Sequence, residues 1–286
     1  MIGTRKVRVA MTSGKSSAAW LVAFLGVSSG LCALQAMTPT LEEILQRLEA
    51  NLNHYDTRVP SLFCDEHVIA QVEPSLPSGD TVTDSIFRLK RTANPDETST
   101  LVESREIKTI NNKPATSQHM NGPAMLIGAF EGGLAVVSLD QRACMNYALQ
   151  QTNRDRPAQP YIVRFATRLT PQNTEGCLLK ENSNGRVSID PASMQIARLE
   201  LTTPRYVIDP GKSYTLPVVG RRIITVDYAP VLLGDETFWM PSAITMRIIN
   251  DSDFNGTAWS FRATYRNYHK MEVTSRIVPG SAAPVP

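Results

Sequence analysis

After its first 36 residues, the sequence lacks the short motifs that mark common enzyme classes. It has no Gly-x-Ser-x-Gly elbow, no His-Glu-x-x-His helix, no Cys-x-x-Cys pair, no phosphate loop and no dinucleotide fingerprint. Histidine is scarce too, and no two of the four histidines stand at the spacing of metal ligands: His54, His67, His119 and His269. We therefore expect a non-enzymatic protein without catalytic residues, metal or cofactor.

An excess of positive charge is also missing. Lys and Arg number 29 against 27 Asp and Glu, and no run of basic residues could follow a phosphate backbone. Nucleic acid is therefore not an expected partner.

The N-terminal segment has the pattern of a secretory signal peptide. It carries four basic residues and no acidic one before Glu42, and it is apolar from Ala18 to Val27. An apolar stretch of this length is typical of a signal, because a membrane span needs about 20 apolar residues. We predict that residues 1–36 are removed after Ala36, which leaves 25 basic and 27 acidic residues and a formal net charge near −2.

Cys32 raises the alternative of a lipoprotein, in which an acylated cysteine becomes the mature N-terminus. Such a site has a small residue directly before the cysteine and an aliphatic one earlier. The order Gly30-Leu31-Cys32 is the reverse. We therefore expect an exported protein of the periplasm or the extracellular space, without attachment through Cys32.

Three cysteines remain after cleavage, and in an oxidising compartment two of them should pair. Cys144 and Cys177 both lie in strand-like segments whose connection could bring them side by side, so we predict that they form the disulfide. Cys64 should be a buried apolar residue. Its neighbour His67 cannot serve it locally, since residues three apart on a strand point to opposite faces.

One helix is well specified at the start of the mature chain. Thr40 and Glu43 form a capping box, and an apolar stripe follows at helical spacing: Leu41, Ile44, Leu45, Leu48 and Leu52. We expect this helix to end between Asn53 and Asp56, and Pro60 to prevent its continuation.

Most later segments are predicted as strands separated by turn residues, namely 61–72, 81–91 and 101–110. Two hairpins follow, one around Asp190–Ser193 and one around Leu233–Glu236. The glycine-rich segment Pro123–Asp140 is ambiguous, and we predict a short helix there. One β-rich domain should span residues 37–278, with a loose tail at 279–286.

The last strand shows the clearest alternation. From Trp259 to Ile277, apolar side chains occupy most odd positions and polar ones most even positions. Asn267 and His269 interrupt the apolar side and should place a polar notch on the inner face, where His269 could orient a ligand head group.

The order of elements, together with the segments Val226–Pro230, Gly234–Pro241 and Ala263–Tyr268, resembles the LolA- and LolB-like lipoprotein-carrier superfamily. It is also similar to a group of secreted proteins of soil acidobacteria. The resemblance implies an α+β fold, in which a strongly curved antiparallel half-barrel surrounds an apolar cavity beneath an N-terminal amphipathic helix and a short helical lid.

On this basis we expect a monomer that holds an acyl chain, a lipid or a lipidated protein on its concave face, in peripheral contact with a membrane. The expected ligand-binding residues are Trp259, Phe261, Tyr265, Met246 and His269. The alternative is a structural or protein-interaction module of the envelope with a filled core. A hydrolase would require a His and an acidic side chain that converge in a cleft.

Overall fold

The computed structural model describes residues 39–72, 80–93, 99–116, 130, 141–150, 159–168, 176–206, 218–256 and 258–272. The chain divides into two units, Met1–Thr38 and Pro39–Pro286. The predicted signal peptide with Cys32, the predicted tail at 279–286, and all of the predicted helix at 123–140 except Phe130 lie outside the described residues.

Helix α1 spans Leu41–Arg58 and begins at the predicted capping box. The backbone N–H of Glu43 donates to Thr40 Oγ1 at 3.2 Å, and the N–H of Thr40 donates to the Glu43 carboxylate at 2.7 Å. The helix continues a few residues beyond the predicted end, because Tyr55 adds another turn to its buried stripe.

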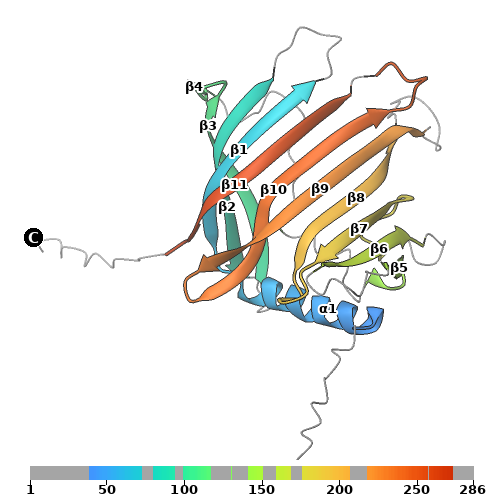
Figure 1. The fold of residues 1–286 in the computed structure, drawn as a ribbon. Helices are drawn as coiled ribbons and strands as arrows, with labels where there is room; N and C mark the ends of the chain where they lie inside the picture. The colour runs from blue at the N-terminus through green and yellow to red at the C-terminus, as the bar shows by residue number, and fades with distance from the viewer. Residues whose placement is uncertain are drawn as a thin grey trace, which may run out of the picture. The chain divides into compact units, whose positions relative to one another are not determined.

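The described strands form one antiparallel sheet, in the order β4-β3-β2-β1-β11-β10-β9-β8-β7-β6-β5 (Figure 1). The prediction of a large antiparallel sheet with one N-terminal helix is therefore confirmed. The bounds are β1 Leu62–Val72, β2 Thr81–Ala93, β3 Ser99–Ile110, β4 Lys113–Pro114, β5 Met145–Gln150, β6 Tyr161–Thr167, β7 Asn184–Ile189, β8 Ile196–Tyr206, β9 Val218–Leu233, β10 Glu236–Asn250 and β11 Trp259–Lys270.

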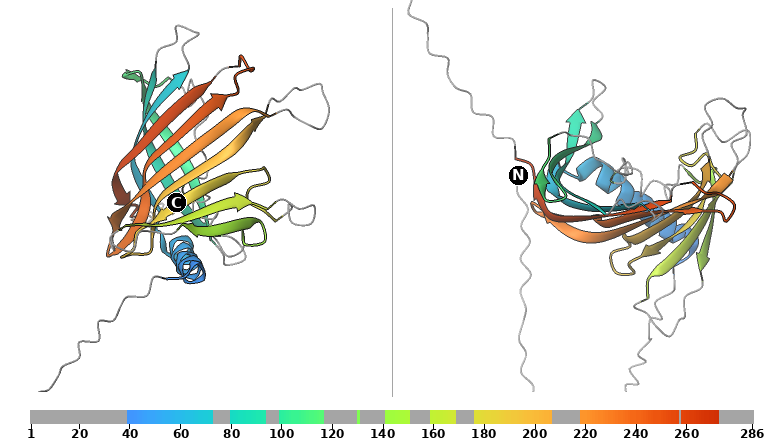
Figure 2. Two further views of the ribbon diagram at one scale, coloured as in Figure 1. Left: turned by 45° about the vertical axis from the view of Figure 1, so that its right-hand side comes forward. Right: turned by 90° about the horizontal axis from the view of Figure 1, so that it is seen from above.

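Each long strand buries alternate residues, as expected for a sheet with one solvated face. We call the face with the buried side chains the inner face. Its apolar cluster crosses most of the sheet, from β2 and β1 through the middle strands to β8 and β7: Val68, Phe87, Met246, Phe261, Val226, Leu199 and Val187. Figure 2 shows β1–β3 turned relative to the middle strands.

Helix α1 lies across one end of the strands (Figure 1). Near its start, Glu42 forms an ion pair with Arg142, which precedes β5. In its middle, Asn51 donates a hydrogen bond to the backbone oxygen of Met194 in the β7–β8 turn, at 2.7 Å. At its end, His54 lies 3.2 Å from Glu236 at the β9–β10 turn. The helix thus closes this end of the inner face with Ile44, Leu48 and Tyr55.

The two predicted hairpins are present, with tight connections between β7 and β8 and between β9 and β10. Gly234 in the second turn has φ +71°, a left-handed conformation that glycine adopts without strain.

The predicted disulfide joins Cys144 and Cys177, whose Cα atoms lie 5.6 Å apart. Cys64 is free and buried, as predicted. Cys177 does not lie on a strand, however: it precedes β7 in an irregular stretch, and the disulfide ties this stretch to the start of β5. The strand prediction around Cys177 failed because the alternation there is too short to distinguish a strand from a covalently held loop.

Candidate functional site

Four of the five residues predicted from the sequence to bind a ligand lie on the inner face of β10 and β11. Met246 pairs with Phe261 across the two strands, and Trp259 stacks on Phe261 with 6.2 Å between ring centroids. Met246, Phe261 and Tyr265 are buried, whereas Trp259 is half-buried. The structure thus brings these four side chains together on one apolar surface.

His269 does not join them, and its predicted inward orientation is wrong. Asn267 has φ +55°, and Asn267 and Tyr268 together oppose the single residue Cys64 of β1, which is a β-bulge. The extra residue shifts the alternation, so that Tyr268 turns toward the core. His269 is exposed and stacks on Phe63, with 5.0 Å between ring centroids. The strand then ends at Lys270, short of the predicted extent.

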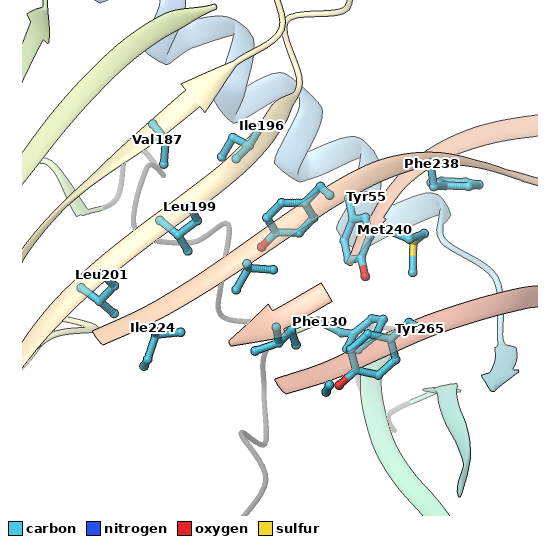
Figure 3. Close-up of a cluster of buried hydrophobic side chains, with 14 of the residues drawn as sticks. Tyr55, Phe130, Val187, Ile196, Leu199, Leu201, Ile224, Phe238, Met240 and Tyr265 are labelled. Atoms are coloured by element: carbon cyan, nitrogen blue, oxygen red, sulfur yellow. The ribbon is translucent and has the colours of Figure 1, made fainter. Parts of the chain in front are cut away.

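A second aromatic group on the same face involves a residue that the sequence did not single out. Phe130, only 2% exposed, stacks on Phe87 at 4.2 Å and meets Tyr265 edge-on at 5.2 Å. Figure 3 shows Phe130 beside Tyr265, with Tyr55 and Met240 in the same cluster. The backbone N–H of Phe130 donates to Glu103 Oε1 at 3.1 Å. Phe130 thus occupies part of the apolar surface next to the predicted ligand residues.

A charged cluster lies beside these aromatic rings and is almost fully buried. Arg105 donates from Nε to both carboxylate oxygens of Glu66, at 3.0 and 3.1 Å, and its Nη1 lies 3.6 Å from Glu103 Oε2. The Arg105 guanidinium also lies 4.8 Å from the centre of the Phe87 ring. We call Glu66, Glu103 and Arg105 the buried charged cluster.

The surroundings shift the pKa values of this cluster. Burial raises the pKa of Glu66 above its usual value, and the positive charge of Arg105 only partly opposes this effect. Burial and then the Glu66 carboxylate raise the pKa of Tyr265, which shares a hydrogen bond with Glu66. For Arg105, burial is the largest single effect and lowers the pKa, but the interactions with Glu66, Tyr265 and Glu103 together outweigh it and raise the pKa, so the guanidinium stays charged.

Cys64 and His67 do not form a pair of nucleophile and base. Burial first, and Glu66 second, raise the pKa of the Cys64 thiol to about 12, so it is a thiol at neutral pH. His67 lies on the opposite, solvated face, with its Nδ1 2.7 Å from the Asp84 carboxylate. This His–Asp pair stands on an exposed sheet surface, and neither residue lines the cleft at the end of α1.

An open cleft of about 550 Å³ lies elsewhere, at the C-terminal end of α1. Its lining is mixed and partly charged: Thr57, Arg58, Val59, Pro60, Arg91, Leu233, Asp235, Glu236, Phe238 and Lys270. Within this lining, Arg91 donates from Nε to the Val59 backbone oxygen at 2.9 Å, and its Nη1 donates to Ser99 Oγ at 2.6 Å. None of the five predicted ligand-binding residues lines this cleft.

Among the described residues, no three His, Cys, Asp or Glu side chains are grouped so that they could hold a metal ion. In the same part of the chain, no helix has both the length and the apolar character needed to cross a bilayer.

The alternation of the strands could have revealed the buried charged cluster. Glu66 falls in phase with Leu62, Cys64 and Val68 on the buried side of β1. Glu103 and Arg105 fall in phase with Ile107 on β3. Charged residues at successive inward positions of neighbouring strands are the signal for this cluster.

No family model and no curated protein matches the sequence. Solved structures do match. A DUF1329 family protein from Desulfovibrio piger is 8% identical, with a TM-score of 0.41 over 83% of this chain and 96% of that one. A putative outer membrane lipoprotein-sorting protein domain from Vibrio parahaemolyticus is 10% identical, with a TM-score of 0.34 over 78% and 90%. A LolA superfamily protein from Nitrosomonas europaea is 9% identical, with a TM-score of 0.33 over 80% and 94%.

The chain is therefore similar to solved LolA-superfamily and lipoprotein-sorting structures, in line with the resemblance stated from its sequence. All three TM-scores are below 0.5, so these similarities assign no function. The functional argument rests on the inner face and its residues.

Proposed function

We propose that this chain is an exported, non-enzymatic binding protein that holds an apolar ligand, such as an acyl chain, a lipid or a lipidated peptide, on its inner face. The proposal includes the strong curvature of the sheet and the short helical lid expected from the sequence. The ligand would lie along Trp259, Phe261, Tyr265 and Met246.

The observation that carries the proposal is the continuous apolar surface of β10 and β11, partly occupied by Phe130. Phe130 is separated in sequence from every described strand; its ring packs on Phe87 and on Tyr265 of β11, and its backbone N–H donates to Glu103 on β3. An acyl chain could replace such a contact with one of the same chemical kind. The disulfide supports export, because disulfides persist in oxidising compartments.

The energetics of such binding are favourable. Each methylene moved from water to an apolar surface contributes about 0.8 kcal/mol, so a 16-carbon chain gains roughly 10 kcal/mol before costs. Displacement of Phe130 and the lost freedom of the ligand reduce this gain by several kcal/mol. We therefore expect affinities on the order of micromolar.

The proposal is tested by titrating a fluorescent fatty-acid probe into the purified mature chain, residues 37–286. Met246→Ala should weaken binding by about tenfold, because it removes apolar contact area. Thr245→Ala is the matched control, since Thr245 is adjacent on β10 and points to the other face. If the wild type does not bind the probe, the proposal fails. Equal losses in both variants would also contradict it.

A second candidate is an envelope module that binds protein and keeps a filled core. The burial of Met246, Phe261 and Tyr265 favours it, because no ligand is needed to remove them from water. In that case native mass spectrometry of the exported protein should find no bound lipid, and chemical crosslinking in the envelope should capture a specific protein partner.

A further inference from the structure

The buried charged cluster leaves two hydrogen-bonding atoms unused. Glu103 Oε2 and Arg105 Nη2 are buried and have no hydrogen-bond partner within the described part of the protein. The Glu103 side chain is only 3% exposed. A buried polar atom without a partner costs about 1–3 kcal/mol, so a cluster that keeps two of them requires an explanation.

Two hydroxyl groups on the neighbouring strand are in the same situation. Ser85 Oγ and Thr83 Oγ1 are buried and also lack a partner in the described structure. Ser85 pairs in register with Glu66 on one side and with Ile107 on the other, which places it on the inner face between β1 and β3. We call the unused atoms of Glu103 and Arg105 on β3, together with Ser85 Oγ on the adjacent strand β2, the polar patch.

This polar patch adjoins the proposed path of the ligand. Glu66 pairs in register with Tyr265, and Tyr265 stands on the same side of β11 as Phe261. Glu103 also accepts a hydrogen bond from the backbone N–H of Phe130, and the Phe130 ring packs against Tyr265. A ligand whose tail lies along Phe261 and Met246 would thus bring its polar end to the patch.

The chemistry of the unused atoms decides which polar end would fit. Arg105 Nη2 can only donate a hydrogen bond, and ionised Glu103 can only accept one. A carboxylate offers acceptors alone and would face the negative charges of Glu66 and Glu103. An ammonium group offers donors alone and leaves Arg105 Nη2 without an acceptor. A hydroxyl or a primary amide both donates and accepts, and can satisfy both atoms.

We propose that this polar patch selects apolar ligands whose head group is uncharged and both donates and accepts hydrogen bonds, such as the hydroxyl groups of a monoacylglycerol or a primary amide. This inference rests on the proposed function and adds the class of ligand to it. A single unmatched polar group in a buried site lowers affinity by roughly tenfold or more, so the selection should be measurable.

The test compares four ligands with the same chain: monopalmitoylglycerol, palmitamide, palmitate and hexadecylamine. Each displaces a fluorescent acyl probe from the mature chain at neutral pH, below its aggregation threshold. The two uncharged ligands should bind about tenfold more tightly than palmitate and hexadecylamine. This ranking needs only the wild-type protein.

A pair of variants then locates the selection. Glu103→Gln removes one of the carboxylate charges, so palmitate should approach the affinity of the uncharged ligands. Glu106→Gln is the matched control: it lies on β3 as well, but it pairs with Arg88, at 2.5 Å, on the opposite face. It should preserve the wild-type ranking.

The outcomes separate this inference from the proposed function. Equal binding of all four ligands, or a preference for either charged one, overturns the head-group inference and leaves the apolar-ligand proposal standing. A wild-type ranking that Glu103→Gln and Glu106→Gln both leave unchanged also overturns it, provided that both variants are folded by circular dichroism. If the probe itself does not bind, both proposals fail together.

Discussion

Phe130→Ala should have opposite effects on stability and on ligand binding. The ring is buried, stacks on Phe87 and touches Tyr265, so its loss removes core packing. Phe→Ala changes at such positions lower the free energy of unfolding by about 3–5 kcal/mol. The backbone N–H that donates to Glu103 remains in the variant, so this loss reports the ring alone.

The same change should strengthen the binding of an acyl ligand. In the wild type a ligand must displace the ring from the apolar surface, and in the variant this cost is absent. Even if only about 1.4 kcal/mol of the packing energy opposes the ligand, affinity should rise about tenfold.

The assay for this prediction combines urea unfolding with titration of a fluorescent fatty-acid probe. Phe63→Ala is the matched control: Phe63 is half-buried on the opposite face, against His269, and its removal should leave probe affinity unchanged. An unchanged or weaker affinity of Phe130→Ala for the probe would refute the idea that Phe130 occupies the place of the ligand.

Three further predictions concern the fold. A Cβ at Gly185 would lie 2.1 Å from a backbone oxygen of β8, so Gly185→Ala should lower the free energy of unfolding by about 1–3 kcal/mol. Gly176 has open space around the position of a Cβ, so Gly176→Ala should leave the free energy of unfolding unchanged. Equal effects of the two variants in urea unfolding would contradict this prediction. The Cys144–Cys177 bond closes a loop with a sequence separation of 33, and the Cys144→Ser variant should lose about 3–4 kcal/mol of stability; an unchanged urea midpoint would argue against that role. Because burial raises the pKa of Glu66, the folded state binds this proton more tightly than the unfolded state does, so the stability from this proton is present below the unfolded pKa of about 4.5 and is lost as the pH rises toward the raised folded pKa. The Glu66→Gln variant should therefore gain stability relative to the wild type between pH 4.5 and neutrality. A difference in stability that does not depend on pH would exclude this cause.

The parts of the fold that follow from local chemistry could be predicted from the sequence. The capping box of Thr40 and Glu43 determines where α1 begins, and the alternation of apolar and polar residues on β10 and β11 identifies which face is buried. Met246 and Phe261 were found in this way, because each strand keeps its phase between the turn residues that bound it.

The rest depended on interactions that local patterns do not encode. The bulge at Asn267 shifts the phase of β11 by one residue, and only the pairing with β1 reveals it, so His269 was placed on the wrong face. Phe130 gave no periodic signal, since it contacts the sheet from a glycine-rich segment. Glu66 and Arg105 of the buried charged cluster are 39 positions apart in the sequence. Only the register of β1, β2 and β3 shows that their side chains meet.

The most direct test of the central claim is to crosslink an acyl chain to the protein and identify the modified residues. A palmitoyl ligand with a diazirine in the middle of its chain is irradiated with the mature protein, and the adducts are mapped by peptide mass spectrometry. Adducts on the inner-face residues of β10 and β11, around Met246 and Phe261, are the predicted result. Adducts only on outer-face residues such as Thr245 and Arg262, or no specific adduct, would contradict the account.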